Sequence, residues 1–280
     1  MFKNTLPYIS NPIEEFKDFK LVSWERDIYP QFKGKVKQDE IDFYVDIIEQ
    51  QNLKSIIDFG VGGGLELSGI LETLGRRKYA WTRAEANEVD DGFIEQSGAL
   101  FCTKRQHILI HHANWLDLPK ADPPYEGTFD FALLTGNSLT YIGGGTREYT
   151  KKAQQIIVNK FAQLIEPGGY FFIDSRNYDY IHSLMNLPTD HIFQHFLFDD
   201  SIYYHGRVLV FPAYISDTVV VLHYYDKDRK VWSKLDLYPI YQHDMIDILS
   251  KDFTVECVYH DFKKEIKEKS LFIQYLARRK

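Results

Sequence analysis

From residue 38 onward, hydrophobic and polar positions alternate between two spacings. Ile41, Tyr44, Val45 and Ile48 recur at the three- and four-residue spacing of an amphipathic helix over residues 38–51. After this helix, short apolar runs of strand length alternate with further stretches of helical spacing. This β-α-β-α order predicts an α/β fold with a doubly wound, mostly parallel, Rossmann-like sheet. The expected strands are residues 55–59, 78–86, 107–111, 129–135 and 170–174, and the expected helices between them are residues 65–74, 90–98 and 146–165.

The pattern changes near residue 190. Three β-rich runs follow one another there with few helical signals, which predicts an antiparallel β insertion. The chain then returns to a helix and two strands, and these fit the antiparallel edge that is often added to a parallel sheet. The expected elements are β runs at 196–211, 213–225 and 231–238, a turn at 226–230, a helix at 242–251 and strands at 253–260 and 270–277.

These changes divide the chain into four parts. Prolines at 7, 12 and 30 favour short helices and loops at the start rather than a core. The turn Glu166–Gly169 is expected to separate the longest helix from the strand that follows it. The parts are an N-terminal segment at 1–52, a Rossmann-like core at 53–190, the antiparallel β insertion at 191–240 and the closing helix and strands at 241–280.

Composition and charge narrow the class of protein. The chain has 280 residues, of which 44% are hydrophobic and 26% charged, as in ordinary globular proteins. A net charge of −7 argues against a nucleic-acid substrate, which is bound mainly through Lys and Arg. Cys102 and Cys257 stand alone and suggest neither a disulfide framework nor a thiolate metal site. The N-terminus lacks the apolar run of a signal peptide, and no stretch is long and apolar enough for a membrane span, so we expect a cytoplasmic protein.

A glycine-rich loop carries the strongest signal of chemistry. Asp58, Gly60, Gly62 and Gly64 form the pattern D-x-G-x-G-x-G between a strand and a helix. The dinucleotide pattern G-x-G-x-x-G would need glycine where Leu65 stands. Asp58 would also repel a pyrophosphate, whereas it would attract a ligand that carries an ammonium group. The loop therefore favours S-adenosyl-L-methionine (SAM) over NAD; the alternative is a glycine-rich turn with no ligand.

Acids that follow the next strand supply a candidate ribose ligand. Glu85 lies 27 residues after Asp58 and is taken as the end of its strand, where an acid accepts hydrogen bonds from a ribose diol. Glu88, Asp90 and Asp91 follow it and are the alternatives, which we interpret as helix-capping acids.

Asn114 and Trp115 follow the third strand. The Asn114 amide both donates and accepts, which suits an adenine edge, and the Trp115 ring is suited to covering the base. The alternative is a turn with a buried tryptophan anchor. The neighbouring pair His111 and His112 cannot converge on one metal ion, because adjacent residues of a strand face opposite ways.

Two further strand ends point to an acceptor site. Asn137 follows the fourth strand at the carboxyl edge, where it is placed to hold a small polar molecule or simply to form a turn. Arg176 follows the fifth strand, where a guanidinium binds an acidic group in a two-pronged fork. The alternative for Arg176 is an ion pair with Asp174 or Asp179.

Together, these runs resemble a known family. FDFALLTGNSLTYI, FFIDSRNYDYI and ANWLDLP, with SIIDFGVGGG before them, are similar to glycine N-methyltransferase and its glycine/sarcosine relatives, which are class I SAM-dependent methyltransferases. The resemblance covers about residues 40–280. It implies that Gly136 and Asn137 contact the substrate amine and that Arg176 binds its carboxylate. The cofactor site implied by the resemblance, together with the loop above, comprises Trp24, Lys37, Asp58, Gly60, Gly62, Gly64, Glu85, Asn114, Trp115, Thr135, Gly136 and Tyr141.

The resemblance also implies that tyrosines of the β insertion line the methyl-transfer site, the nearest matches being Tyr204, Tyr224 and Tyr238. It implies a lid formed by the N-terminal segment and self-association. Because the sulfonium of SAM already activates the methyl, we expect no metal. The chain departs from the family at Tyr141, where the usual member has His, and at Gly143–Gly145. We therefore expect an N-methyltransferase that acts on glycine or sarcosine. The alternatives are methylation of another small-molecule acceptor, or SAM binding without turnover.

Overall fold

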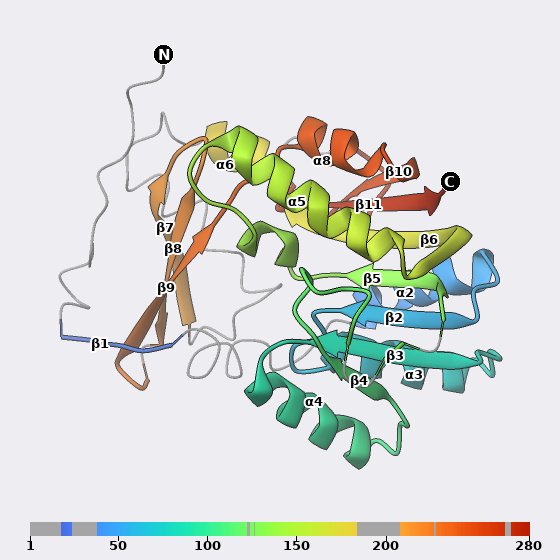
Figure 1. The fold of residues 1–280 in the computed structure, drawn as a ribbon. Helices are drawn as coiled ribbons and strands as arrows, with labels where there is room; N and C mark the ends of the chain where they lie inside the picture. The colour runs from blue at the N-terminus through green and yellow to red at the C-terminus, as the bar shows by residue number, and fades with distance from the viewer. Residues whose placement is uncertain are drawn as a thin grey trace. The chain divides into compact units, whose positions relative to one another are not determined.

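The computed structural model describes residues 18–23, 38–121, 124–125, 127–183, 208–226, 228–266 and 270–280. These residues fall into two compact units, which are described separately (Figure 1). The larger unit comprises the described parts of Lys35–Leu139, Lys151–Asn177 and Gln242–Lys280, and the smaller unit comprises those of Met1–Gly34, Thr140–Thr150 and Tyr178–Tyr241. The expected division at residues 52, 190 and 240 stays a prediction.

A seven-stranded sheet forms the centre of the larger unit. Its strand order is β10-β11-β6-β5-β2-β3-β4. Strands β2 to β6 run parallel to one another, β11 pairs antiparallel with β6, and β10 pairs antiparallel with β11. The α/β fold with a mostly parallel sheet and an antiparallel edge is therefore confirmed. The strands are β2 (Ser55–Phe59), β3 (Arg83–Glu88), β4 (Leu109–His112), β5 (Phe129–Leu134), β6 (Ile165–Arg176), β10 (Phe253–His260) and β11 (Phe272–Arg279).

Helices cover both faces of this sheet (Figure 1). On one face, Ile56 and Ala86 belong to a core with the buried sides of α2 and α3, and we call this the α2/α3 face. On the other, Phe59 stacks on Phe161 of α5 with ring centroids 4.2 Å apart, and we call this the α5 face. The helices are α2 (Gln38–Gln50), α3 (Leu65–Arg76), α4 (Asp91–Thr103), α5 (Arg147–Ala162) and α8 (Gln242–Leu249).

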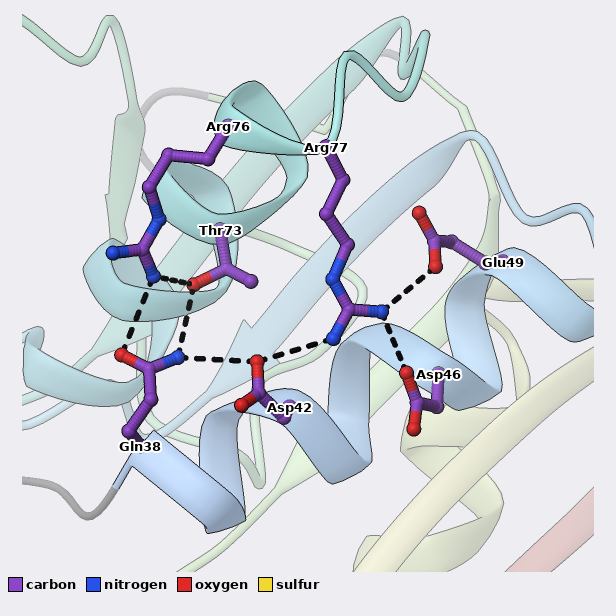
Figure 2. A network of polar contacts seen from close by, with 7 residues as sticks. All are labelled: Gln38, Asp42, Asp46, Glu49, Thr73, Arg76 and Arg77. Atoms are coloured by element: carbon purple, nitrogen blue, oxygen red, sulfur yellow. Dashed lines mark hydrogen bonds and ion pairs between the residues drawn. The ribbon is translucent and has the colours of Figure 1, made fainter.

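A polar network joins side chains along α2 to the C-terminal end of α3 (Figure 2). The guanidinium of Arg77 forms ion pairs with Asp42, Asp46 and Glu49 at 3.1, 2.6 and 2.9 Å. The hydrogen bonds to Asp46 and Glu49 raise the pKa of Arg77 above its ordinary value. Because these groups are partly exposed, the network adds little to the burial that holds the two helices together.

Two expected boundaries in the larger unit are wrong. The strand expected at 78–86 is β3, Arg83–Glu88, because the apolar residues Tyr79 and Trp81 pack against the core from a connecting segment rather than from a strand. The expected turn Glu166–Gly169 lies inside β6, since Ile165 already pairs with Phe129 and the register shifts before Tyr170. Pro-Gly-Gly therefore makes a bulge and not a boundary.

The smaller unit is built on a four-stranded sheet of order β1-β9-β8-β7. Strands β7 to β9 form the expected antiparallel meander, whereas the parallel contact of β1 with β9 was not predicted. Only two exposed residues make β1, so no apolar pattern marks it. The elements are β1 (Lys20–Leu21), β7 (Val208–Ile215), β8 (Val220–Asp226), β9 (Val231–Leu237) and α6 (Tyr178–Ser183), with the short 3-10 helix η3 (Ser138–Tyr141) at the boundary of the units.

The break expected near residue 212 is also wrong. Strand β7 continues through Pro212 with a register shift, which an edge strand tolerates, and the turn lies at Ser216–Val219. Beside β9, the His223 ring lies 4.7 Å from that of Trp232. Burial and, to a lesser degree, the charge of Lys234 lower the pKa of His223 to about 4, so this histidine is neutral at neutral pH.

In the described part of the chain, no helix has both the length and the apolar character needed to cross a membrane.

Candidate cofactor and acceptor site

Backbone hydrogen bonds fix the glycine loop that follows β2. The N–H groups of Gly60 and Val61 both donate to the carbonyl of Asn87, at 2.9 and 3.0 Å. Gly60 and Gly64 have φ of +78°. A Cβ at Gly60 would lie 2.9 Å from the Trp115 ring, and one at Gly64 would lie 2.9 Å from Phe101. Both positions therefore require glycine for conformation and for space.

Helix α3 begins directly after this loop. Its N-cap is Gly64, and no side chain caps the helix there. The first N–H groups of a helix have no partner within the helix, so they stand ready for an oxygen of a ligand. The start of α3 thus supplies donors at the carboxyl edge of the sheet, and the internally bonded loop holds it there.

Two carboxylates lie on the α2/α3 face beside the loop. Asp58 is opposite Ala86 in the sheet, so the alternation of side chains places Asp58 and Glu88 on the same face. Both side chains are buried. Glu88 ends β3 and accepts from Gly62 N at 2.9 Å through one oxygen, and from Val89 N and Asp90 N at 2.7 and 3.1 Å through the other. A carboxylate has about four acceptor positions, so it retains capacity for a ligand hydroxyl.

The expectation that Glu85 ends its strand is wrong. Glu85 lies in the middle of β3, opposite Ile57, and therefore on the α5 face, away from Asp58. Its carboxylate pairs with the buried His111, and Arg83 lies 3.4 Å away. Glu88 takes the strand-end position instead. Asp90 is the helix cap, since its side chain accepts from Phe93 N at 3.0 Å.

Trp115 and Asn114 have local partners. The Trp115 indole N–H donates to the Asn87 side chain at 3.0 Å, and the ring packs edge-on against Phe161. Asn114 is exposed, and its side-chain oxygen accepts from Leu116 N at 2.9 Å. These contacts favour the alternative of a turn with a tryptophan anchor. The roles of Asn114 and Trp115 toward adenine stay predictions.

Asn87 was not predicted from the sequence. Its carbonyl holds the glycine loop, its side-chain oxygen holds Trp115, and its side-chain nitrogen donates to the carbonyls of His111 and Ala113. His111 is buried and His112 is exposed, so the two imidazoles point to opposite faces. Within the described ranges, no group of three or more His, Cys, Asp or Glu could hold a metal ion.

The end of β5 is tied to the end of β6. The carboxylate of Asp174 accepts from Gly136 N at 3.1 Å and from Asn137 N at 2.7 Å. The side-chain oxygen of Asn137 in turn accepts from Arg176 N at 2.9 Å. Asn137 and Arg176, both expected in the acceptor site, are therefore brought together. Thr135, expected in the cofactor site, lies just before this turn, and its carbonyl accepts from Ser138 Oγ at 2.6 Å. The Arg176 guanidinium lies 5.2 Å from the centre of the Phe272 ring.

Other expected site residues belong to the smaller unit or lie outside the described residues. Tyr224 is buried on β8, and Tyr238 follows β9 and donates its N–H to Thr140 O at 2.8 Å. Tyr141 ends η3 and is exposed. Trp24, Lys37 and Tyr204 lie outside the described residues.

Comparison with known proteins identifies the fold. A crystal structure of an S-adenosylmethionine-dependent methyltransferase from Clostridium acetobutylicum superposes with a TM-score of 0.58 at 16% identity, over 91% of this chain and 95% of that one. The chain therefore has the fold of such methyltransferases. No family model matches it.

Two curated relatives add sequence similarity. Glycine/sarcosine N-methyltransferase of Halorhodospira halochloris is 25% identical over 231 residues, which are 81% of this chain and 74% of that protein. Glycine N-methyltransferase of Rattus norvegicus is 36% identical over 75 residues, which are 27% of this chain and 25% of that protein. The chain thus matches only a quarter of the rat protein's length.

Proposed function

We propose that this protein is a SAM-dependent N-methyltransferase that acts on the amine of a small amino acid, glycine or sarcosine. The observation that carries the proposal is a row of polar side chains on the α2/α3 face at the carboxyl edge of the sheet. Glu88, Asp58, Asp174 and Arg176 lie on this face at the ends of β3, β2 and β6. Ligands of open α/β sheets bind at this edge.

The residues at this edge fit SAM. The uncapped start of α3 suits the carboxylate of its methionine part, and Asp58 suits the ammonium group. Glu88, in place of Glu85, is suited to the ribose hydroxyls, because it ends β3 on the same face as Asp58. A phosphate would meet two carboxylates here, which disfavours NAD.

Bound SAM supplies a methyl group that is already activated by the sulfonium. The protein then has to hold an amine in line with that methyl, so orientation supplies most of the catalysis. Arg176 would fix the carboxylate of the amino acid by a charge-assisted, two-pronged contact. Asn137 and the carbonyls of the Gly136 turn would accept hydrogen bonds from the amine and direct its lone pair.

The sequence similarity supports this acceptor over others. The relative from Halorhodospira halochloris, matched over most of both chains, is named for glycine and sarcosine. The segments quoted for the resemblance include Asn137 and Arg176, which the fold brings within one hydrogen bond of each other. A larger amine is the competing acceptor, and SAM binding without turnover is the other alternative.

The test is methyl transfer from isotopically labelled SAM to a panel of glycine, sarcosine, larger amino acids and amino sugars, read by mass spectrometry. We expect labelled sarcosine or dimethylglycine as the product. Labelled product from an amino sugar alone would replace the acceptor, and binding of SAM without any product would remove the enzymatic proposal.

Arg176→Met sharpens the test, with Arg278→Met as its control. Arg278, on β11, is exposed, and its guanidinium lies over the ring of Tyr170 on β6. Loss of a charge-assisted pair worth about 3 kcal/mol should lower kcat/KM for the amino acid about 100-fold. The affinity for SAM should stay unchanged in both variants. An Arg176 variant with the wild-type kcat/KM would remove the carboxylate contact.

A further inference from the structure

The turn that follows β5 has an unusual backbone. Gly136 and Asn137 are consecutive residues with φ of +75° and +63°. Glycine adopts this region readily, and asparagine is among the few other residues that tolerate it. Two such residues in succession turn their N–H groups toward one point, which forms a small anion-binding concavity.

A side chain of the protein itself occupies that concavity. One oxygen of Asp174 accepts from Gly136 N and the other from Asn137 N, at 3.1 and 2.7 Å. Asp174 is buried, so its charge depends on these donors. A substrate carboxylate cannot use the same N–H groups, and its recognition is left to Arg176.

The contact extends back to the strand that carries Asp174. The side-chain oxygen of Asn137 accepts from Arg176 N, two residues beyond Asp174 on β6. This hydrogen bond, the one from Asn137 N to Asp174 and the backbone from Asp174 to Arg176 therefore form a closed ring. If Asp174 released the turn, the backbone position of both acceptor residues would change.

We infer that Asp174 is a positioning residue, which sets Asn137 and Arg176 for the acceptor without touching it. This inference rests on the proposed function. It predicts an effect on the acceptor that is separate from the effect on SAM, because the glycine loop is held by Asn87 and Glu88 and not by Asp174.

The same sheet offers a matched control at its other edge. The carboxylate of Asp130 accepts from Lys54 N and Ser55 N at 2.7 and 2.8 Å, where β2 and β5 begin. It too brackets two successive N–H groups, at the opposite end of the strands from the turn at Gly136 and Asn137. Asp130→Asn and Asp174→Asn thus disturb equivalent bonds with different expected consequences. Ser175→Ala is a second control, because Ser175 is buried beside Asp174 but points to the opposite face.

The experiment measures KM for glycine, kcat, and the calorimetric Kd for SAM in the wild type and these three variants. In Asp174→Asn we expect KM for glycine to rise at least about tenfold, the change that corresponds to loss of one hydrogen bond, with the Kd for SAM changed less than about threefold. Asp130→Asn should lower the melting temperature and leave KM unchanged, and Ser175→Ala should change neither. KM does not depend on the folded fraction, so partial unfolding cannot mimic the expected result.

Two outcomes would overturn the inference. One is a KM for glycine in Asp174→Asn equal to that of Asp130→Asn, and the other is an equal weakening of SAM and glycine. Asp174→Glu serves if the Asn variant does not fold; it keeps the charge with a longer reach, and it should also raise KM. If the wild-type protein methylates no amine, the proposed function and the inference both fail. If the wild type methylates glycine but Asp174→Asn behaves like Asp130→Asn, only the inference fails.

Discussion

The two faces of the seven-stranded sheet carry acids that are buried to the same degree and do different things. Glu85 on the α5 face is 4% exposed, and Asp58 and Glu88 on the α2/α3 face are 3% and 7% exposed. Glu85 is matched by cationic or protonatable side chains, His111 and Arg83. Glu88 is matched by backbone N–H groups of the glycine loop and of its own strand end. Equal burial of these acids therefore goes with different kinds of partner.

The difference lies in position along the strand and in the kind of partner. A buried carboxylate needs compensation wherever it lies. In the middle of β3 the compensation is a side-chain pair that closes the site. At the end of β3 it is a set of backbone donors that also shapes a loop at the edge where ligands bind.

The largest effect should come from Glu88→Gln. Gln keeps the size of the side chain but loses its charge. Its NH₂ group would face backbone N–H groups that are themselves donors, which weakens the hold on the loop and the proposed contact with the ribose. We expect the Kd for S-adenosylhomocysteine to rise at least about 100-fold, equivalent to about 3 kcal/mol, in a calorimetric titration. The exposed Glu95→Gln on α4 is the control. Wild-type affinity in Glu88→Gln would break the comparison.

Glu85→Gln should give the opposite pattern. The buried His111 loses its charged partner, so the free energy of unfolding in urea should fall by about 2 kcal/mol. The Kd for S-adenosylhomocysteine should change less than about threefold, the scatter of such substitutions. A large loss of affinity without a loss of stability would return the ribose contact to Glu85.

Trp115→Phe tests whether this ring, which packs on the α5 face, is an anchor or a cofactor contact. The variant keeps the ring packing on Phe161 and loses the hydrogen bond to Asn87. We expect a loss of about 1 kcal/mol in unfolding free energy and little change in cofactor affinity. If affinity fell about tenfold at constant stability, equivalent to 1.4 kcal/mol, Trp115 would be a cofactor contact rather than an anchor.

The smallest effect should come from Arg77→Met, far from the edge of the sheet. It removes three ion pairs between α2 and α3 (Figure 2). Because these pairs are partly exposed, we expect a loss below about 1 kcal/mol. The loss should shrink in 1 M salt, where the screening length falls to about 3 Å. A loss that does not depend on salt would mean that packing of the arginine stem, and not charge, is what the variant removes.

The sequence was sufficient for the fold and for the position of the glycine loop. The strand, acid and glycines at 55–64 have strong local signals, and β2 and β10 lie at the residues expected. The boundaries of β3 were missed because Tyr79 and Trp81 look like strand residues but are buried from a connection. For the same reason Glu85 was wrongly placed at the end of its strand, a position that Glu88 takes. The N-cap Asp90 is the signal that would have placed the strand end at Glu88.

The role of Asp174 was beyond the sequence for a different reason. It depends on two N–H groups 37 and 38 residues earlier in the chain, which reach it only because β5 and β6 are neighbours. A local pattern shows an acid beside an arginine and suggests an ion pair. Only the sheet order shows that the acid binds a turn.

The most direct test of the central claim is a crystal structure with S-adenosylhomocysteine, in which the distances from the ribose hydroxyls to the two acids are measured. We predict hydroxyl oxygens within hydrogen-bonding distance, about 2.6–3.2 Å, of the Glu88 carboxylate on the α2/α3 face, with the Glu85–His111 pair intact. Ribose bound by Glu85, or a ligand seated on the α5 face, would contradict it.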